Sequence, residues 1–428
     1  MKKYIVFSVF LSLFFFYSCY TNNSGKKANY GEKTLEMIEI VESNPNIKSL
    51  LLASIKQAKE INPDRNTNPA QNLEEYYEFV SWSEKSMPWS LLKTPENLKL
   101  WDKIEQSLSY FSFLNDQPLS ELEGKGYPNH SLQYVEPYSS WLISFNKAWG
   151  NYLDTEDSWN DNYYQIALAD DRFGLKNDWY EDPSNWKTFN QFFSRYLKSP
   201  ARRPIEAPND NSIVVSPVDA LPQGVWEIDS NSYVVEKRGV PIKSGTLYSI
   251  EKLIGEDSEY ELVFANGTFT HTFLDLQDYH RYHFPLSGIV KEVRIIPGQN
   301  GTGGIVTWDS INNRYAYSIL NLGWQSIETR GSIILETEEF GLVALLPIGM
   351  SPVCSVNFEE NIKVGGRVAK GDMLGYFLFG GSDFIMIFQA KAGFVLVAPK
   401  EEENSQSYKH LLMGEQIGYL KRDLSTKK

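Results

Sequence analysis

The sequence predicts an α+β protein, with an N-terminal mostly helical domain followed by a mostly antiparallel β domain. In the first half, apolar residues recur at the three- and four-residue spacing of helix faces. Beyond a proline-rich stretch, short apolar runs alternate with Gly, Asn and Asp turns, which is typical of antiparallel sheets. The 428 residues, 42% of them hydrophobic, are enough for two or three domains with their own cores.

The N-terminus reads as a targeting segment. Lys2 and Lys3 precede the apolar run 4–17, which is short for a membrane span but suits a signal-peptide core. Ser18 and Cys19 close this run, and together they resemble a bacterial lipoprotein signal over residues 1–19 with Cys19 lipidated. We therefore expect a membrane-associated lipoprotein of a bacterial cell envelope, held by an N-terminal lipid anchor. An uncleaved anchor or an ordinary signal peptide is the alternative, because Phe16 and Tyr17 fit the usual lipobox poorly.

Residues 28–197 form the predicted helical domain. Two groups of apolar residues lie at helical spacing: Leu35, Ile38, Ile40 and Val41, and then Leu50, Leu51, Leu52, Ile55 and Ala58. Further helices are expected over 74–83, 141–152 and 186–197. Asp182-Pro183-Ser184 provides a start signal for the last of these.

A connector is predicted over residues 198–210, because Pro200, Pro204 and Pro208 stop a helix and favour extended backbone. The β domain then covers residues 211–428. Its expected strands are 213–215, 224–228, 260–264, 288–296, 314–319, 332–336 and 342–347. Residues 364–376 are expected to form a hairpin-like turn between two apolar strands.

The formal net charge of -13 argues against nucleic acid as a partner, because phosphate binding depends on clustered Lys and Arg. It also argues against docking on anionic lipid through a general basic field. Because the chain holds only Cys19 and Cys354, a lipidated or removed Cys19 leaves no internal disulfide.

The run Phe379-Gly380-Gly381-Ser382, followed by an apolar stretch, is the candidate reactive segment. Two glycines permit unusual backbone conformations and leave the Gly381 carbonyl sterically open to the neighbouring hydroxyl of Ser382. Taken alone, such a Gly-Gly-Ser is more often a simple turn. Its interpretation depends on the rest of the chain.

Only five histidines occur, and two of them, His280 and His283, lie three residues apart. Imidazole is well suited to move protons near neutral pH. His-x-x-His also suits a metal, but no third and fourth ligands lie nearby, so we expect no metal site. Structural histidines in a tyrosine-rich core are the other interpretation.

Asp219 lies in the apolar stretch that contains Ser216-Pro217-Val218. A buried, unpaired carboxylate is costly, so Asp219 should have a partner such as His or Arg, unless it is a turn residue. Ser382, a histidine and Asp219 together offer a nucleophile, a base and an orienting group.

In their order and spacing, these segments resemble the phosphatidylserine decarboxylase family of pyruvoyl-dependent enzymes. The resemblance covers residues from Trp186 to the C-terminus. It rests on Phe189-Asn-Gln-Phe-Phe-Ser-Arg195, Arg203-Pro204, Ser216-Pro-Val-Asp219, Asp278-Tyr-His-Arg-Tyr-His283, Leu346-Pro-Ile-Gly-Met350, Lys370-Gly-Asp372 and Phe379-Gly-Gly-Ser382. The helical segment and Gly267-Thr-Phe-Thr-His271 resemble a larger subgroup that includes soluble decarboxylases of free aromatic amino acids.

The resemblance implies that Asp219 orients His283 and that His283 takes the proton from Ser382. Self-cleavage between Gly381 and Ser382 would then convert Ser382 into a covalent pyruvoyl cofactor. His280 would take part in returning a proton to the substrate. The two chains would stay associated.

The implied function is decarboxylation of phosphatidylserine to phosphatidylethanolamine and CO2 through a Schiff base. One alternative is decarboxylation of a free aromatic amino acid. Another is a non-catalytic lipoprotein that keeps the scaffold as a binding module. Asp383 favours the last alternative, because the family usually carries Thr or Ser after the cleaved serine.

Overall fold

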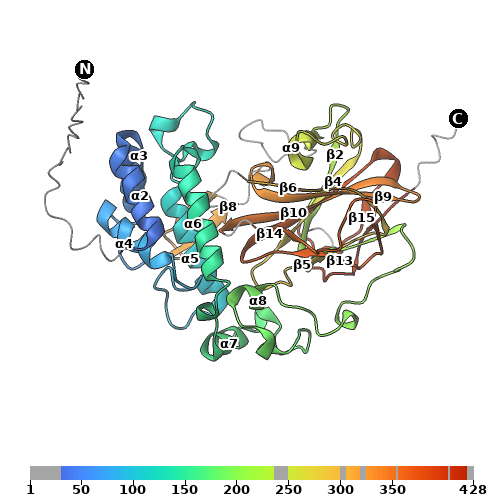
Figure 1. Ribbon diagram of the computed structural model, residues 1–428, viewed down its shortest axis with the longest axis horizontal. Coiled ribbons are helices and arrows are strands. Elements are labelled where there is room, and N and C mark those ends of the chain that lie inside the picture. Colours follow the sequence, from blue (N-terminus) through green and yellow to red (C-terminus); the bar gives the residue numbers. More distant parts are fainter. Residues whose placement is uncertain are drawn as a thin grey trace, which may run out of the picture.

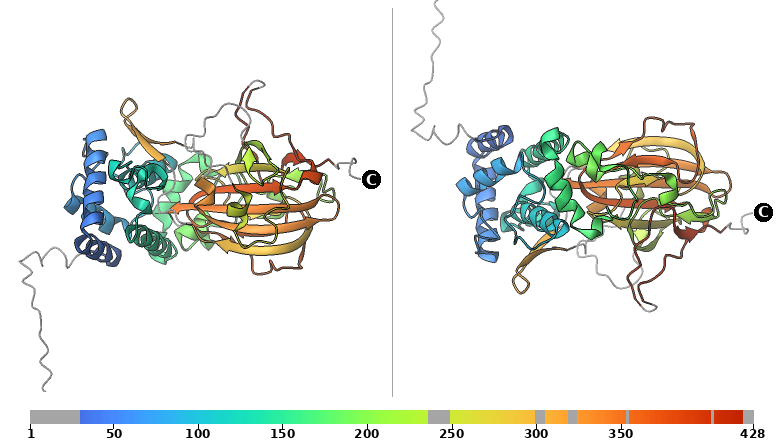
Figure 2. Two further views of the ribbon diagram at one scale, coloured as in Figure 1. Left: turned by 90° about the horizontal axis from the view of Figure 1, so that it is seen from above. Right: turned by 90° about the horizontal axis from the view of Figure 1, so that it is seen from below.

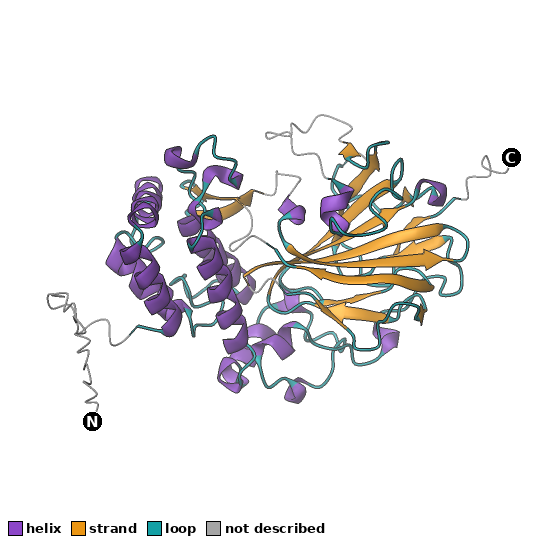
Figure 3. Cartoon of the chain, turned by 45° about the horizontal axis from the view of Figure 1, so that its top comes forward, coloured by secondary structure: helices purple, strands orange, loops and turns teal. Residues whose placement is uncertain are grey.

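A helical part and a β part lie at opposite ends of the long axis of the molecule (Figures 1 and 2). This computed structural model describes residues 30–235, 249–298, 305–318, 324–352, 355–402 and 405–421. The expected α+β class is confirmed: helices gather in the N-terminal part and strands in the C-terminal part (Figure 3). Cys19 and the predicted signal lie outside the described residues.

The α-helices of the described chain are α2 (Glu32–Ser43), α3 (Pro45–Ile61), α4 (Leu73–Ser83), α5 (Leu100–Asn115), α6 (Tyr138–Tyr152), α7 (Asp161–Leu168), α8 (Phe189–Phe193) and α9 (Ile250–Ile254). The start of helix α3 follows from its sequence. Asn44 accepts hydrogen bonds from the backbone N–H groups of Asn46 and Ile47, and Pro45 occupies the first helical position. The two predicted apolar stripes lie on α2 and α3, although Leu35 and Leu52 are exposed. Of the described helices, none is long and apolar enough to span a membrane.

The single helix expected over 186–197 is wrong. Asp182 caps a short 3-10 turn, Pro183–Asn185, and α8 is limited to Phe189–Phe193. Residues 196–198 instead run extended beside 179–181, joined by the Tyr180–Leu197 bridge and the Lys198 N–H to Trp179 carbonyl hydrogen bond. Pairing with a distant segment therefore overrides the local helical pattern.

The strands are β1 (Ile213–Val215), β2 (Leu221–Ile228), β3 (Val234–Val235), β4 (Thr268–Leu274), β5 (Arg281–His283), β6 (Gly288–Ile296), β7 (Ile305–Asp309), β8 (Arg314–Ser318), β9 (Thr329–Thr337), β10 (Gly341–Pro352), β11 (Asn357–Phe358), β12 (Arg367–Val368), β13 (Met373–Tyr376), β14 (Gly380–Phe388), β15 (Val395–Leu396) and β16 (Gln416–Tyr419). The main sheet has the order β12-β6-β9-β10-β14-β4-β2-β3. Smaller sheets are β1-β16-β15, β11-β13-β5 and β7-β8.

Two expectations for the β part are wrong. Residues 260–264 form turns, not a strand, and bury Phe264 against one face of the main sheet. Strands β12 and β13, on either side of the turn within 364–376, do not pair as a hairpin. Strand β12 pairs with β6, whereas β13 pairs with β5 and β11.

The main sheet buries both of its faces. One face packs on a cluster that includes Val218, Leu274, Tyr282 and Phe384, to which the sheets β1-β16-β15 and β11-β13-β5 contribute. The opposite face packs on a cluster that includes Phe269, from β4, and α9. Strand β14 is interior, so its residues meet neighbouring strands on both edges and packed side chains on both faces.

The β7–β8 hairpin extends from the β part and packs on α5, where β8 appears among the helices (Figure 1). Tyr315 fastens it: its hydroxyl donates to the Thr67 carbonyl at 2.8 Å and accepts from Asn62 at 2.9 Å. Gln106 bonds both the N–H and the carbonyl of Tyr315. The hairpin is therefore an arm that ties the two parts of the chain together.

Candidate active site

Ser382 occupies the third position of β14, opposite Gly349 of β10 and Leu274 of β4. Its side chain is fully buried, and its hydroxyl oxygen has no hydrogen-bond partner among the described residues. A buried hydroxyl normally finds a partner, so an unpaired one calls for an explanation. The interior strand therefore places an unpaired hydroxyl inside the protein.

Strand alternation determines where this hydroxyl faces. Ser382 shares a face with Phe384, whose ring lies 5.9 Å from that of Tyr282. Tyr282 precedes His283 on β5, and Val218, in the same cluster, precedes Asp219. Ser382 therefore faces the core layer that contains Tyr282 and Val218, and its hydroxyl makes no hydrogen bond to His283 or Asp219.

The two preceding glycines are needed for different reasons. Gly380 has φ +154°, in the region that favours glycine. A Cβ at Gly381 would lie 3.1 Å from the sulfur of Met350, closer than side chains usually pack. The carbonyl of Gly381 is thus reached without interference from a side chain of its own.

Arg203 is the partner of Asp219, and the prediction of a His or Arg partner is confirmed. Arg203 donates through Nε at 2.9 Å and Nη2 at 2.6 Å, and the Met413 N–H donates to the same carboxylate at 2.7 Å. The guanidinium also lies over the ring of Trp179. Both members of this ion pair are buried, so neither loses its partner without a large cost.

His283 is held by two hydrogen bonds, neither of them to Asp219. Its Nδ1 lies 2.8 Å from the Gly371 carbonyl and its Nε2 lies 3.1 Å from the Tyr279 hydroxyl. A carbonyl only accepts, so Nδ1 carries the hydrogen and Nε2 is left as the basic nitrogen of the neutral ring. Burial lowers the pKa of His283 to about 4, although the Gly371 bond and the charge of Asp219 act to raise it. Asp219 thus acts on His283 through its charge and not through contact.

His280 is also buried and neutral. Its ring stacks on Phe193 at 3.8 Å, and Phe193 in turn contacts Phe379, three residues before Ser382. Burial and the nearby Arg195 charge lower the pKa of His280 well below its usual value. Its Nδ1 has no partner among the described residues. The histidine therefore presents a free basic nitrogen beside the segment that leads into β14.

The segment Lys370-Gly371-Asp372 supplies the carbonyl that orients His283. Lys370 is buried, and its ammonium donates to the carbonyls of Ala207, Asp210 and Ile213. Gly371 has φ +89°, a conformation that side chains disfavour. The hydrogen bonds of Lys370 and the backbone conformation of Gly371 therefore hold the Gly371 carbonyl in place.

Comparison with known proteins agrees with this geometry. The family model described as phosphatidylserine decarboxylase matches residues 189–419, more than half of the chain. The chain belongs to the phosphatidylserine decarboxylase family. The matched region includes Asp219, His280, His283 and Ser382.

Three relatives illustrate the similarity. Phosphatidylserine decarboxylase proenzyme 2 of Oryza sativa subsp. japonica is 32% identical over 252 residues, 59% of this chain but only 37% of that protein. The phosphatidylserine decarboxylase proenzyme of Alcanivorax borkumensis is 31% identical over 288 residues, 64% of this chain and 91% of that protein. Decarboxylase iboD of Amanita muscaria is 26% identical over 271 residues, 57% of this chain and 75% of that protein.

Phosphatidylserine decarboxylase family members in general depend on a pyruvoyl group made from the chain itself. The residues present fit that group. Ser382 has a buried, unpaired hydroxyl, Gly381 precedes it without a side chain, and β14 fixes both between two strands. Groups of His, Cys, Asp and Glu that suit a metal are absent from the described part of the chain.

Sequence reasoning missed the surroundings of Asp383, the residue in which this chain departs from the usual pattern of the phosphatidylserine decarboxylase family. Asp383 is fully buried and accepts hydrogen bonds from His271 Nδ1 at 2.9 Å and Gln325 Nε2 at 3.1 Å. His271 was noted in a motif, but no spacing signal links it to Asp383, because the two meet only through the pairing of β4 with β14. Asp383 faces away from Ser382, so its carboxylate is not beside the nucleophile.

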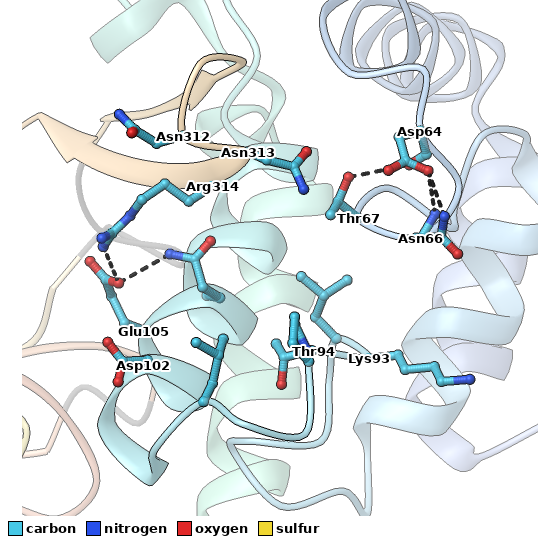
Figure 4. Close-up of a pocket in the computed structure, with 14 residues that line it drawn as sticks. Asp64, Asn66, Thr67, Lys93, Thr94, Asp102, Glu105, Asn312, Asn313 and Arg314 are labelled. Atoms are coloured by element: carbon cyan, nitrogen blue, oxygen red, sulfur yellow. Dashed lines mark hydrogen bonds and ion pairs between the residues drawn. The ribbon is translucent and has the colours of Figure 1, made fainter.

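A polar cleft of about 660 Å³ lies between α5 and the β7–β8 arm, and its lining includes none of the predicted site residues. Glu105 and Arg314 form an ion pair at 2.7 Å on one side of it, and Asp64 lies on the other (Figure 4). The cleft is therefore separate from the predicted site residues.

Proposed function

We propose that this chain is a self-processing, pyruvoyl-dependent decarboxylase that converts phosphatidylserine to phosphatidylethanolamine and CO2. One observation carries the proposal. The hydroxyl of Ser382 is buried without a partner among the described residues, next to an unsubstituted glycine carbonyl, on the face of β14 toward Tyr282 and Val218, which precede His283 and Asp219. This arrangement supports attack on the chain's own backbone better than attack on a substrate.

In the proposed maturation, Ser382 Oγ attacks the carbonyl carbon of Gly381 and the peptide bond becomes an ester. His283 accepts the hydroxyl proton through Nε2 and returns it to the amide nitrogen that is released. Loss of the Cα proton of residue 382 expels the Gly381 carboxylate and leaves dehydroalanine. Water then converts dehydroalanine to the ketone and ammonia, which completes the atom balance.

During turnover the pyruvoyl group supplies an electron sink for the bond that loses CO2. The unpaired nitrogen of the neutral His280 can take up a proton and then pass it to the substrate carbon. Arg203 holds Asp219 in place, and the Asp219 charge favours the transient imidazolium of His283.

Intact-mass spectrometry of the purified protein, with and without Ser382→Ala, tests this function. We expect a C-terminal fragment of residues 382–428 that is lighter than its serine form by one ammonia and is absent from the variant. The two chains are expected to copurify, because β14 pairs with β10 and β4. A single uncut chain in both samples would instead support the non-catalytic binding module.

Decarboxylation of a free aromatic amino acid is the second candidate. Phe379 belongs to the core cluster of the helical part, where it contacts Trp149 and Phe189. The helical part therefore covers the start of β14, which favours a small substrate over a lipid. To distinguish the candidates, the purified protein is given phosphatidylserine vesicles and, separately, tryptophan or tyrosine. Release of CO2 from the amino acids alone would make the amino-acid decarboxylase the preferred function.

The proposed lipid anchor at Cys19 would hold the enzyme at the membrane where phosphatidylserine lies, as a lipoprotein of a bacterial cell envelope. It is tested by labelling cells with a clickable fatty acid. Incorporation that disappears in Cys19→Ala is expected, and equal labelling of both proteins would contradict the anchor.

A further inference from the structure

Asp383 is a fully buried carboxylate one residue after the proposed cleavage point. Removing a carboxylate from water costs several kcal/mol unless it is paired and hydrogen-bonded, so the partners of Asp383 make its burial possible. Oδ2 has two, His271 and Gln325, whereas Oδ1 has none among the described residues.

These contacts join four elements of the fold. His271 lies on β4, stacks on Trp226 of β2 at 5.2 Å and bonds Asp383 of β14. Gln325 approaches the same carboxylate from the 3-10 turn Trp324–Ser326. A row of side chains thus joins Asp383 to the neighbouring strands on the face of the sheet opposite Ser382.

Cleavage changes which part of the chain the contacts of Asp383 hold in place. Before cleavage, residue 382 is fixed by the chain on both sides. After cleavage, residue 382 is a chain end, and strand ends fray unless they are tied down. Asp383 is then the first residue of the small chain with a side chain bonded to another strand.

We propose that His271 is a positioning residue which, through Asp383, holds the reactive end of the small chain against β4. This inference rests on the proposed self-processing. It concerns a pair that the family's usual Thr or Ser at this position does not provide. His271 touches neither substrate nor the reacting atoms in this role, so its effect should appear in the chemical step and not in substrate affinity.

The test compares the wild type with His271→Ala, His271→Gln, Asp383→Thr and the double variant His271→Ala/Asp383→Thr. Intact mass gives the cleaved fraction. On cleaved protein, kcat and KM are measured with phosphatidylserine vesicles and with tryptophan, and the rate of oxime formation is measured with an aminooxy dye. Asp171→Thr, which breaks the exposed pair with Lys176 at 2.7 Å, is the control aspartate-to-threonine change.

Loss of a charge-assisted hydrogen bond predicts that kcat and the oxime rate of His271→Ala fall by roughly tenfold to a hundredfold, with little change in KM. His271→Gln keeps an N–H donor and should recover to within about threefold. The double variant leaves no buried unpaired charge, so it should fold and cleave, yet its kcat should stay low because the tether is missing.

A wild-type kcat in the double variant or in His271→Ala would overturn the positioning role. The contact between His271 and Asp383 would then serve only to keep the buried carboxylate paired. If His271→Ala is insoluble, the double variant and His271→Gln still decide between these outcomes. An uncut wild type would instead overturn the proposed self-processing itself, which separates the two failures.

Discussion

The backbone carbonyl of Gly371 lies 2.8 Å from Nδ1 of His283 and fixes the imidazole as a base that points Nε2 toward the Tyr279 hydroxyl. A backbone acceptor does not titrate, so this orientation holds at any pH at which the turn is folded. The protonation of His283 is then governed by its burial.

The cleavage rate should therefore be constant from about pH 6 to 8 and fall only as pH approaches 4, because the pKa of His283 is about 4. Time courses of precursor disappearance across this range measure it. His283→Gln is expected to cleave slowly at every pH. A midpoint near 6.5 in the wild type would mean that His283 is not the base or is not buried while cleavage occurs.

The same pKa predicts how stability depends on pH. The lowered value means that the unfolded chain binds more protons than the folded chain between about pH 6.5 and 4. The free energy of unfolding should thus fall as pH falls through this window, by up to about 3 kcal/mol from His283. Urea titrations of Ser382→Ala with and without His283→Gln measure the contribution of His283. If the free energy of unfolding depends on pH equally in both proteins, the prediction is contradicted.

Gly381→Ala should slow cleavage by roughly tenfold or more while leaving the fold intact, because the new methyl meets Met350 beside the attacked carbonyl. Met350→Ala/Gly381→Ala restores space and should recover part of the rate. Intact-mass time courses compare the variants. Equal rates for Gly381→Ala and the wild type would show that the site tolerates a side chain there.

Arg203→Met should destabilise the uncut Ser382→Ala protein by about 3–5 kcal/mol, since it leaves the Asp219 carboxylate buried and unpaired. Adding Asp219→Asn should recover part of this loss. The neighbouring Arg202 pairs with Asp178 at the surface, so Arg202→Met is a matched control expected to cost less than about 1 kcal/mol. Urea denaturation gives the three values, and equal losses at 202 and 203 would contradict the buried pair.

Tyr315→Phe should cost about 1–3 kcal/mol, because it leaves the Thr67 carbonyl and the Asn62 amide without the hydroxyl. Tyr317→Phe is the control on the same strand. Its hydroxyl reaches Ser112 only at 3.4 Å, so a smaller effect is expected. Thermal unfolding of both variants checks whether the arm stabilises the joint between the two parts.

What could be predicted from the sequence was the order of elements and motifs. The α+β class follows from periodicity. A partner such as His or Arg was expected for Asp219 from the cost of burying a carboxylate. Each of these depends on local pattern or on a strong energetic rule.

What could not be predicted depends on contacts between distant segments. Residues 196–198 leave the helical pattern because they bond to 179–181. Residues 260–264 look like a strand, but cap a sheet face as turns. His271 and Asp383 are brought together by strand register alone, 112 positions apart in the chain.

The interior position of β14 also determines the order in which folding and cleavage can occur. If the chain cuts itself before Ser382, the small chain supplies an inner strand of a sheet whose other strands belong to the large chain. The precursor refolds as a single molecule, whereas the cut protein, once unfolded, regains its sheet only when two separate chains meet. Recovery from denaturation should then depend on protein concentration for the mature form and not for Ser382→Ala. The chain must fold before it is cut. After the cut, it can no longer refold as a single molecule.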